Sequence, residues 1–372
     1  MINMLKNKKS ESVLAASFLP AAAVLEMTFE CNHECLFCSC PWEAPGESFC
    51  REKELSIEEW KKTLTQLTRM GVSNFAFTGG EPLLKEGILD LIEFAAGLKV
   101  YYTETYQGQL KTTLVPPALF LLSNGRNMSQ EVLNLCLKHQ IHLSMSLPGL
   151  SSYQKHIGGK DTEAGNILFW IKEAQKKGIA VTANITATRL NIHELYETIA
   201  NALIAGASNI LLNRFLYGGR GIDHAEELTL SREEIVFMLD TAEEVLSASE
   251  RYGSIGTEIP LCLIPKPEKY SHLQISTRCS AARDFFVVSP DGYIRTCNHS
   301  PVKLSHISNI ETLKDHPYWK QFVFNDYLPK MCLSCANTDR CDGGCREAAH
   351  ILNGSVKAND PVFSSYELSG KA

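Results

Sequence analysis

Three closely spaced cysteines, Cys31, Cys35 and Cys38, follow the first apolar run of the chain in the pattern C-x3-C-x2-C. Thiolates are strong metal ligands, but three of them leave a metal that needs four ligands one ligand short. For zinc, the missing ligand would leave an open catalytic position. For a 4Fe-4S cluster, it would leave one iron free to bind a substrate or a cofactor. Either metal gives this loop a catalytic role.

Six more cysteines gather near the C-terminus, and the last four form the pattern C-x2-C-x5-C-x3-C: Cys279, Cys297, Cys332, Cys335, Cys341 and Cys345. The chain has 13 cysteines, an odd number in tight groups. This argues against a secreted disulfide framework and for metal binding in a reducing cytoplasm. The remaining cysteines are interpreted as thiols that only pack: Cys40, Cys50, Cys136 and Cys262. The last four C-terminal cysteines fit a zinc-bound loop as well as half of a redox centre.

Composition and charge exclude several classes of partner. With 372 residues, of which 44% are hydrophobic, the chain can bury one sizeable domain and a smaller one. A formal net charge of -6 leaves no basic stripe for phosphate groups, which argues against nucleic acid and an anionic membrane surface. No run approaches the ~18 apolar residues of a membrane span. The N-terminus starts like a signal peptide, but "SES" and Pro20 interrupt its apolar run.

From about residue 22 to 216, short apolar runs alternate with amphipathic runs of helix length. The predicted strands are residues 23–29, 72–78, 118–123, 141–147, 179–188 and 208–216. The predicted helices are residues 56–70, 86–97, 129–140, 163–177 and 193–206, the first with a capping box from Ser56 to Glu59. Repeated strand, helix, strand units form parallel sheets with right-handed crossovers. Six such units predict an α/β fold with a partial (β/α)6 barrel, whose active site lies at the C-terminal strand ends.

Two of these strands have a polar face, which an ordinary parallel strand buried on both sides would not have. The polar positions are His142, Ser144 and Ser146 in the fourth strand, and Thr182, Asn184, Thr186 and Thr188 in the fifth. They predict a barrel lumen that holds a ligand. The alternative is that these side chains only hydrogen-bond within the sheet.

The domain boundaries follow from the change in pattern along the chain. Residues 232–253 form a long amphipathic helix that closes the predicted barrel, and residues 98–117 form an insertion without a readable function. Beyond about residue 256, turn residues and cysteines replace the regular pattern. The predicted segments are an N-terminal segment (1–21), a barrel (22–230), a bridging helix (231–255) and a small metal-organised domain (256–372).

The cysteine loop and the strand ends together resemble the radical S-adenosylmethionine (radical SAM) superfamily. Its motifs occur in order: C-x3-C-x2-C with an aromatic residue before the last cysteine, then "FTGGEPLL", "LLSNG" and "SMSLPG". The resemblance implies that Cys31, Cys35 and Cys38 hold a 4Fe-4S cluster that cleaves SAM reductively to a 5'-deoxyadenosyl radical. It also implies SAM contacts from Phe37, Gly79, Gly80, Glu81, Ser123, Asn124, Ser144 and Ser146. Pro148 replaces an acid of the family, so no role carries over to it.

The C-terminal cysteines resemble the SPASM domain that is appended to many radical SAM enzymes. "VVSPDGYIRTCNHSP", "ISNIETL" and "CDGGCREAA" match its connecting segments, so the resemblance covers most of the chain. It implies two auxiliary iron-sulfur clusters with interleaved ligands. Cys279, Cys297 and Cys345 would hold auxiliary cluster I, and Cys332, Cys335 and Cys341 would hold auxiliary cluster II.

Each auxiliary set has only three cysteines. The family's seventh cysteine usually follows Asp-Pro, whereas this chain reads "NDPVF", with Phe363 at that place. A non-cysteine ligand such as Asp342, His299 or His350 could replace the missing thiol. An open iron and the absence of one cluster are the other possibilities.

The resemblance implies a radical SAM oxidoreductase of the cytoplasm that abstracts a hydrogen atom from a ribosomally made peptide or protein. Two alternatives stay open: maturation of a small cofactor of the tetrapyrrole or quinone type, and a non-catalytic zinc or iron-sulfur structural protein. Thirty residues precede Cys31, too few for a fused peptide-recognition domain. A separate recognition protein and a reductant such as flavodoxin or ferredoxin are therefore expected partners. Arg214 and Arg220 are placed near the barrel mouth or, alternatively, on the ordinary surface.

Overall fold

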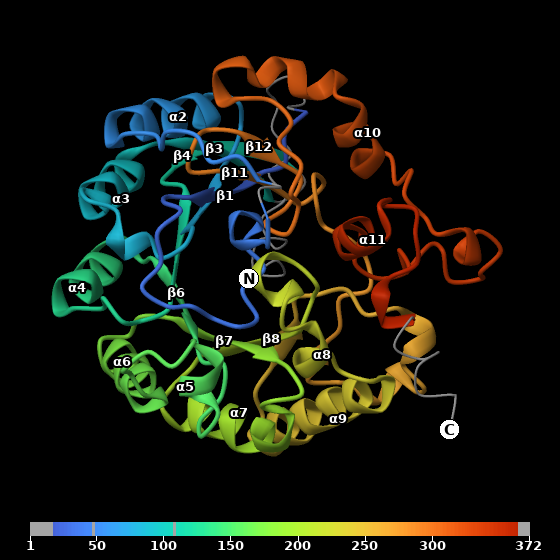
Figure 1. Cartoon of the computed structure of the whole chain (residues 1–372). Helices are drawn as coiled ribbons and strands as arrows, with labels where there is room; N and C mark the ends of the chain where they lie inside the picture. Colours follow the sequence, from blue (N-terminus) through green and yellow to red (C-terminus); the bar gives the residue numbers. More distant parts are fainter. Residues whose placement is uncertain (1–17, 47–48, 107–108, 364–372) are drawn as a thin grey trace.

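A ten-stranded sheet forms the centre of the computed structural model, which describes residues 18–46, 49–106 and 109–363 (Figure 1). The six predicted strands are all present: β1 (Ala22–Glu26), β2 (Asn74–Thr78), β5 (Ala118–Ser123), β6 (His142–Ser146), β7 (Val181–Ala187) and β8 (Asn209–Arg214). Neighbours in the order β1, β2, β5, β6, β7, β8 pair in parallel. The predicted α/β partial barrel is therefore confirmed.

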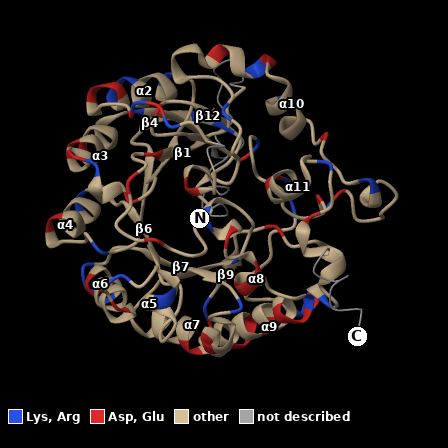
Figure 2. Cartoon of the chain, in the orientation of Figure 1, with Lys and Arg blue, Asp and Glu red and all other residues tan. Residues whose placement is uncertain are grey.

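The helices that connect these strands lie on the outside of the curved sheet (Figure 1). They are α2 (Ile57–Arg69), α3 (Ile88–Gly97), α4 (Gln130–His139), α6 (Ala164–Lys176), α7 (Leu195–Ile204) and α9 (Arg232–Ala248). Helix α2 begins with the predicted capping box, in which the Ser56 hydroxyl and the Glu59 carboxylate satisfy backbone N–H groups. Its buried face consists of Trp60, Thr63, Leu64 and Leu67. Lys, Arg, Asp and Glu are interspersed on the outer helices, as an amphipathic pattern requires (Figure 2).

The insertion and the shorter elements lie around this core. Residues 98–117 contain an antiparallel hairpin of β3 (Val100–Tyr106) and β4 (Gln109–Val115), separate from the main sheet. The short helices are α5 (Tyr153–His156), α8 (Ala225–Leu228), α10 (Pro317–Val323) and α11 (Arg346–Asn353). Among the described residues, no helix has both the length and the apolar character that crossing a membrane requires.

The cysteine-rich C-terminal part contributes strands to the same sheet. β9 (Gly253–Ile255) pairs with β8, and β10 (Leu273–Gln274) pairs with β9. On the other side, β11 (Phe285–Val288) runs parallel to β1 and pairs with β12 (Ile294–Arg295). The predicted boundary near residue 256 thus falls within one continuous sheet.

A buried ion pair fixes this junction. The side chains of Arg295 on β12 and Glu26 at the end of β1 are 0% and 2% exposed, and the guanidinium donates to the carboxylate. Arg295 also donates to the Ser289 hydroxyl at 2.8 Å and to the Ser300 carbonyl at 2.6 Å. Burial raises the pKa of Glu26, although Arg295 opposes this shift. The pair therefore joins the first barrel strand to the loop that carries Cys297.

Candidate functional site

One cavity of about 420 Å³ lies at the C-terminal ends of the strands. It is lined by residues from both cysteine-rich parts of the chain, among them Cys31, Cys35, Cys38, Cys279, Cys297 and Cys345. All eight residues that the resemblance assigns to SAM also line it: Phe37, Gly79, Gly80, Glu81, Ser123, Asn124, Ser144 and Ser146. The structure therefore brings fourteen of the seventeen predicted site residues to one place; whether they hold the predicted cofactors stays a prediction.

The loop of Cys31, Cys35 and Cys38 is held by two later segments of the chain. The Glu34 N–H donates to the Ile157 carbonyl at 3.1 Å, and the Leu36 N–H donates to the His156 carbonyl at 2.9 Å. From the segment after β8, the Gly221 N–H donates to the Cys38 carbonyl at 3.1 Å. These hydrogen bonds therefore hold the backbone of the loop in place, and Cys31, Cys35 and Cys38 line the cavity.

The electrostatics of these three thiols favour a bound cation. Burial raises the pKa of Cys31 to about 11, although the His33 N–H opposes this shift. Burial, followed by the charges of Cys38 and Cys31, raises the pKa of Cys35 well above its usual value. The Cys40 thiol, as a hydrogen-bond partner, lowers the pKa of Cys38 instead. A cationic metal centre would compensate the cost of ionising such clustered thiols.

The "GGEP" motif packs against the residue before the first cysteine. An added Cβ on Gly80 would lie 2.0 Å from the Glu30 carbonyl oxygen, so no side chain fits there. The Glu81 N–H donates to the same carbonyl at 2.8 Å. The expected close approach of the glycines to a ligand is thus, in part, an approach to the cysteine loop itself.

Glu81 is buried at the floor of the cavity and connects two strand ends. Its carboxylate accepts hydrogen bonds from the Ser123 hydroxyl at 2.8 Å and from the Asn124 N–H at 2.7 Å. Burial raises its pKa to about 7 despite these bonds. The Asn124 amide donates to the Cys31 thiol at 3.8 Å. Ser123 and Asn124 therefore support the acid and the cysteine loop in this structure.

Four of the seven polar residues that were predicted to face the barrel lumen do line the cavity. Ser144, Ser146, Asn184 and Thr186 line the cavity, and the Ser144 hydroxyl is a buried group without a hydrogen-bond partner. His142 and Thr182 instead bond to each other at 2.7 Å, as the alternative of hydrogen bonds within the sheet predicted. Thr188 does not line the cavity either, and its hydroxyl bonds to His156 Nε2 at 2.8 Å. An orphaned hydroxyl in a cavity wall indicates a polar ligand or water there.

Cys279, Cys297 and Cys345 form another part of the cavity wall, together with Glu258, an acid that sequence reasoning missed. Burial raises the pKa of Cys279 well above its usual value, and the Glu258 carboxylate raises it further. Glu258 has the same effect on Cys345. Burial in turn raises the pKa of Glu258 to about 7. No motif surrounds Glu258 in "GTEIP", so only the fold could reveal it.

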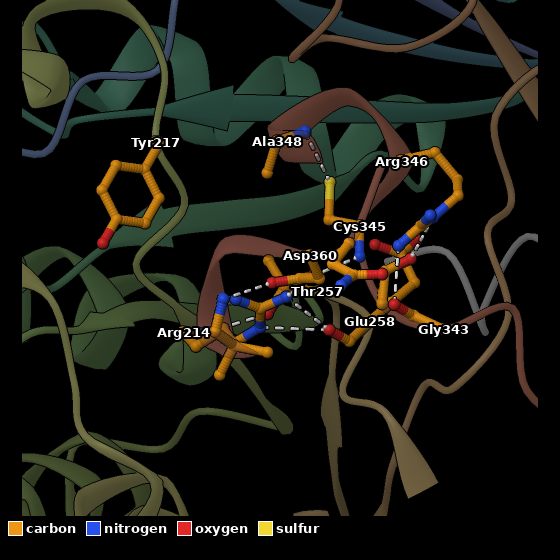
Figure 3. Close-up of polar contacts among 12 residues, drawn as sticks. Arg214, Tyr217, Thr257, Glu258, Gly343, Cys345, Arg346, Ala348 and Asp360 are labelled. Carbon is orange, nitrogen blue, oxygen red and sulfur yellow. Dashed lines mark hydrogen bonds and ion pairs between the residues drawn. The ribbon is translucent and has the colours of Figure 1, made fainter. Parts of the chain in front are cut away.

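A buried network behind this wall contains Arg214 (Figure 3). Its guanidinium donates to the Glu258 carbonyl at 2.9 and 3.0 Å and to the Asp360 carboxylate at 2.5 Å. Asp360 also accepts from the Cys345 N–H at 2.6 Å. Arg214 is only 4% exposed, so of the two expectations for it, the surface position is wrong. Arg220 is half-buried and donates to the Cys35 carbonyl at 3.3 Å.

Cys332, Cys335 and Cys341 lie apart from the cavity as a third thiol group. Burial raises the pKa of Cys332, and the charge of Cys341 contributes to this shift. The interpretation of the four remaining cysteines as packing thiols holds only for Cys136, which is buried in the core. Cys50 and Cys262 are exposed, and Cys40 lines the cavity.

The three proposed substitute ligands have other partners. Asp342 accepts from the Cys279 N–H at 2.8 Å and from the Tyr327 hydroxyl at 2.9 Å. His350 contacts the Tyr318 hydroxyl at 3.0 Å. His299 lines the cavity, where its Nε2 bonds to the Tyr217 carbonyl. Asp342 therefore braces the backbone of a cysteine, and His299 alone of the three lines the cavity.

The thiol groups supply the ligand type that iron-sulfur clusters use. Within the described ranges, no three His, Cys, Asp or Glu side chains come close enough to hold one metal ion. Two of the thiol groups line one cavity, and cysteine thiolates are the usual ligands of iron-sulfur clusters. The buried acid, the orphaned hydroxyl and the cavity volume are compatible with a polar cofactor beside the first group.

Comparison with known proteins identifies the family. Residues 25–202 match the family profile described as the radical SAM superfamily. The PqqA peptide cyclase of Rhodopseudomonas palustris is 26% identical over 366 residues, which cover 95% of this chain and 89% of that protein. The PqqA peptide cyclase of Gluconobacter oxydans is 26% identical, with coverage of 93% and 90%.

Solved structures share the fold. Streptococcus suis SuiB bound to precursor peptide SuiA superposes with a TM-score of 0.69 at 15% identity, covering 92% of this chain and 75% of that one. Native anSMEcpe with bound AdoMet and Cp18Cys peptide has a TM-score of 0.64 at 14% identity, covering 93% and 94%. From the profile match and the site geometry, we conclude that this chain is an enzyme with a radical SAM domain at residues 25–202, and that its similarity to the relatives extends over more than 90% of its length.

Proposed function

We propose that this enzyme modifies a ribosomally made peptide by abstracting a hydrogen atom from one of its C-H bonds. The observation that carries the proposal is one cavity lined by two groups of three cysteines and by polar strand residues. The relatives named PqqA peptide cyclase span nearly the whole chain, which favours a peptide over a small cofactor as substrate. The fold is also that of SuiB bound to its precursor peptide.

The residues divide into three roles. Cys31, Cys35 and Cys38 would hold the 4Fe-4S cluster, with Glu81 oriented towards the amino group of SAM. When bound, the cluster and SAM supply a carbon-centred radical that can abstract hydrogen from an unactivated C-H bond. Ser144, Ser146, Asn184 and Thr186 would orient polar groups of SAM and substrate in the lumen. Cys279, Cys297 and Cys345 would hold an auxiliary cluster in the wall of the same cavity.

The remaining partners follow from this proposal. An external electron donor such as flavodoxin or ferredoxin would reduce the enzyme in the cytoplasm. A separate recognition protein would present the peptide if the chain itself does not bind it tightly. Binding measurements of a candidate peptide, with and without such a protein, distinguish these two cases.

Coexpression with short peptides encoded beside the gene tests the proposed function. We expect a peptide whose mass changes only in the presence of the active enzyme, as measured by mass spectrometry of the purified peptide. The matched control is the Cys35→Ala variant, which should leave the mass unchanged. If neighbouring genes encode a cofactor pathway and no neighbouring peptide changes mass, the peptide assignment is wrong and cofactor maturation replaces it.

Glu81→Gln should weaken SAM binding. A hydrogen bond to a charged group contributes about 1.5 to 3 kcal/mol, which corresponds to roughly 10- to 100-fold in affinity. Isothermal titration of the reconstituted protein with SAM measures this change. Because Ser123 and Asn124 also donate to Glu81, thermal unfolding is measured in parallel.

The control for this variant is Glu131→Gln, at an exposed position on helix α4. It should leave SAM affinity unchanged. Unaltered SAM binding by a folded, iron-loaded Glu81→Gln protein would contradict the role of Glu81.

A further inference from the structure

The third thiol group, which comprises Cys332, Cys335 and Cys341, is built around Gly343. The Gly343 N–H donates to the Cys341 thiol at 3.4 Å, and an added Cβ on this glycine would lie 3.0 Å from the Cys332 sulfur. Its φ of +74° also favours glycine. The Cys335 N–H donates to the Cys332 carbonyl at 3.0 Å in a tight turn. The three thiols therefore come from one compact loop in which a side chain at position 343 would be crowded and strained.

A fourth cysteine from a distant part of the sequence reaches this loop. Cys262 is the middle residue of a short 3-10 helix, Leu261–Leu263. The N–H of Leu261 donates to the Cys341 sulfur at 3.4 Å. Because adjacent Cα atoms lie about 3.8 Å apart, the next residue along the chain is beside the thiol group as well.

The helical turn that carries Cys262 is anchored on both sides. Leu263 and Ile264 are buried in the core, whereas Cys262 is exposed. The Arg232 guanidinium at the start of helix α9 donates to the Cys262 carbonyl at 3.4 Å. This fixed backbone holds the cysteine at the edge of the loop.

Phe363, which stands where the family has its seventh cysteine, has a packing role in this chain. Phe363 packs against the hydrophobic core. The preceding Asp360 accepts from the Val362 N–H at 2.8 Å, from Cys345 and from Arg214. The "NDPVF" segment therefore contributes packing and a buried hydrogen-bond network in place of a thiolate.

We propose that Cys262 is the fourth thiolate ligand of the site formed by Cys332, Cys335 and Cys341, which then holds an iron-sulfur cluster with a complete set of cysteines. Four cysteine thiolates are the ordinary ligand set of a 4Fe-4S cluster. The N–H groups of Leu261 and Gly343 would donate to its sulfur ligands, a contact that tunes such clusters. This inference rests on the proposed function only in assuming that the enzyme binds iron-sulfur clusters.

Thiol protection in the reconstituted wild-type enzyme tests the proposal. Cys50, Cys262 and Cys335 are all exposed, so exposure alone predicts that all three react with iodoacetamide. We expect mass spectrometry to show rapid labelling of Cys50, with labelling of Cys262 and Cys335 slower by at least about tenfold. After oxidation and chelation of the clusters, both protected cysteines should react together. Labelling of Cys262 as fast as Cys50, with Cys335 protected, overturns the proposal.

Variants give an independent readout. Cys262→Ala and Cys335→Ala should lower the iron content equally, by up to about four atoms per chain. The double variant should lose no more iron than either single variant, and Cys50→Ala should lose none. Wild-type iron content and an unchanged electron paramagnetic resonance spectrum in Cys262→Ala would contradict the assignment. Formation of 5'-deoxyadenosine reports separately on the cluster at Cys31, Cys35 and Cys38, so failure of this proposal and failure of the proposed function are distinguishable.

Discussion

Replacing Cys35 with alanine should abolish the formation of 5'-deoxyadenosine from SAM. The cysteine loop is held in place by hydrogen bonds from its backbone to residues 156 and 157, so loss of one side chain leaves the loop in position. Loss of one of three thiolates should nevertheless remove the cluster from this loop. We expect a decrease of at least about 1,000-fold, equivalent to about 4 kcal/mol, measured by chromatography of the reaction with SAM and dithionite.

The C-terminal thiols provide an internal control for this variant. Their visible absorption should persist in Cys35→Ala, because those cysteines belong to other segments of the chain. Cys136→Ala, which removes a buried thiol of the core outside the cavity, should keep both the absorption and the activity. Full activity in Cys35→Ala would exclude the loop as the site of SAM cleavage.

Arg295→Met should cause the largest loss of stability. Removal of one partner from a buried ion pair leaves the other charge without compensation and typically costs about 3 to 5 kcal/mol. Arg295 is 0% exposed, and it also donates to the carbonyls of Asn298 and Ser300. We expect the unfolding temperature of the reconstituted protein to fall by roughly 5 to 10 °C. The iron content should fall too, because the same loop carries Cys297.

Two further variants distinguish the stability lost with the buried ion pair from the effect of removing any positive charge. Glu26→Gln combined with Arg295→Met should recover part of the stability, because no unpaired carboxylate remains. Lys138→Met breaks the exposed pair with Glu93, whose side chains are 63% and 45% exposed, and should cost less than about 1 kcal/mol.

The Arg295→Met variant also has an expected pH dependence. Burial already raises the pKa of Glu26, and loss of Arg295 raises it further. A carboxyl group with a raised pKa in the folded state is tolerated when protonated and destabilises the fold as the pH rises through that pKa. The deficit of Arg295→Met should therefore be smaller at mildly acidic than at mildly alkaline pH. Equal deficits at both values would indicate that Glu26 does not titrate there.

The sequence predicts the barrel well because its strands and helices repeat with clear periods. The first strand shows where local patterns stop being sufficient. The prediction extended it to residue 29, but β1 ends at Glu26. Beyond this point, the Glu54 carboxylate accepts from the Phe29 N–H at 2.7 Å and from the Thr28 hydroxyl at 2.8 Å. A side chain 25 residues away thus replaces a strand partner.

The C-terminal part and some cavity residues could not be predicted from local patterns, because contacts between residues far apart in the sequence position them. The pairing of β11 with β1 joins residues more than 250 positions apart, for which no local pattern exists. Cys262 and Glu258 lack motifs of their own, and their positions near the thiol groups follow only from the folded chain. By contrast, all eight residues assigned to SAM came from motifs at strand ends, which parallel sheets bring together at one edge.

The most direct test of the central claim is the reaction of the anaerobically reconstituted wild-type enzyme with SAM and dithionite. A radical SAM enzyme should bind iron and sulfide, absorb broadly in visible light and release 5'-deoxyadenosine. The metal content, measured on the same sample, distinguishes iron from zinc. A colourless, zinc-loaded protein that leaves SAM intact would contradict the account and favour a structural metalloprotein.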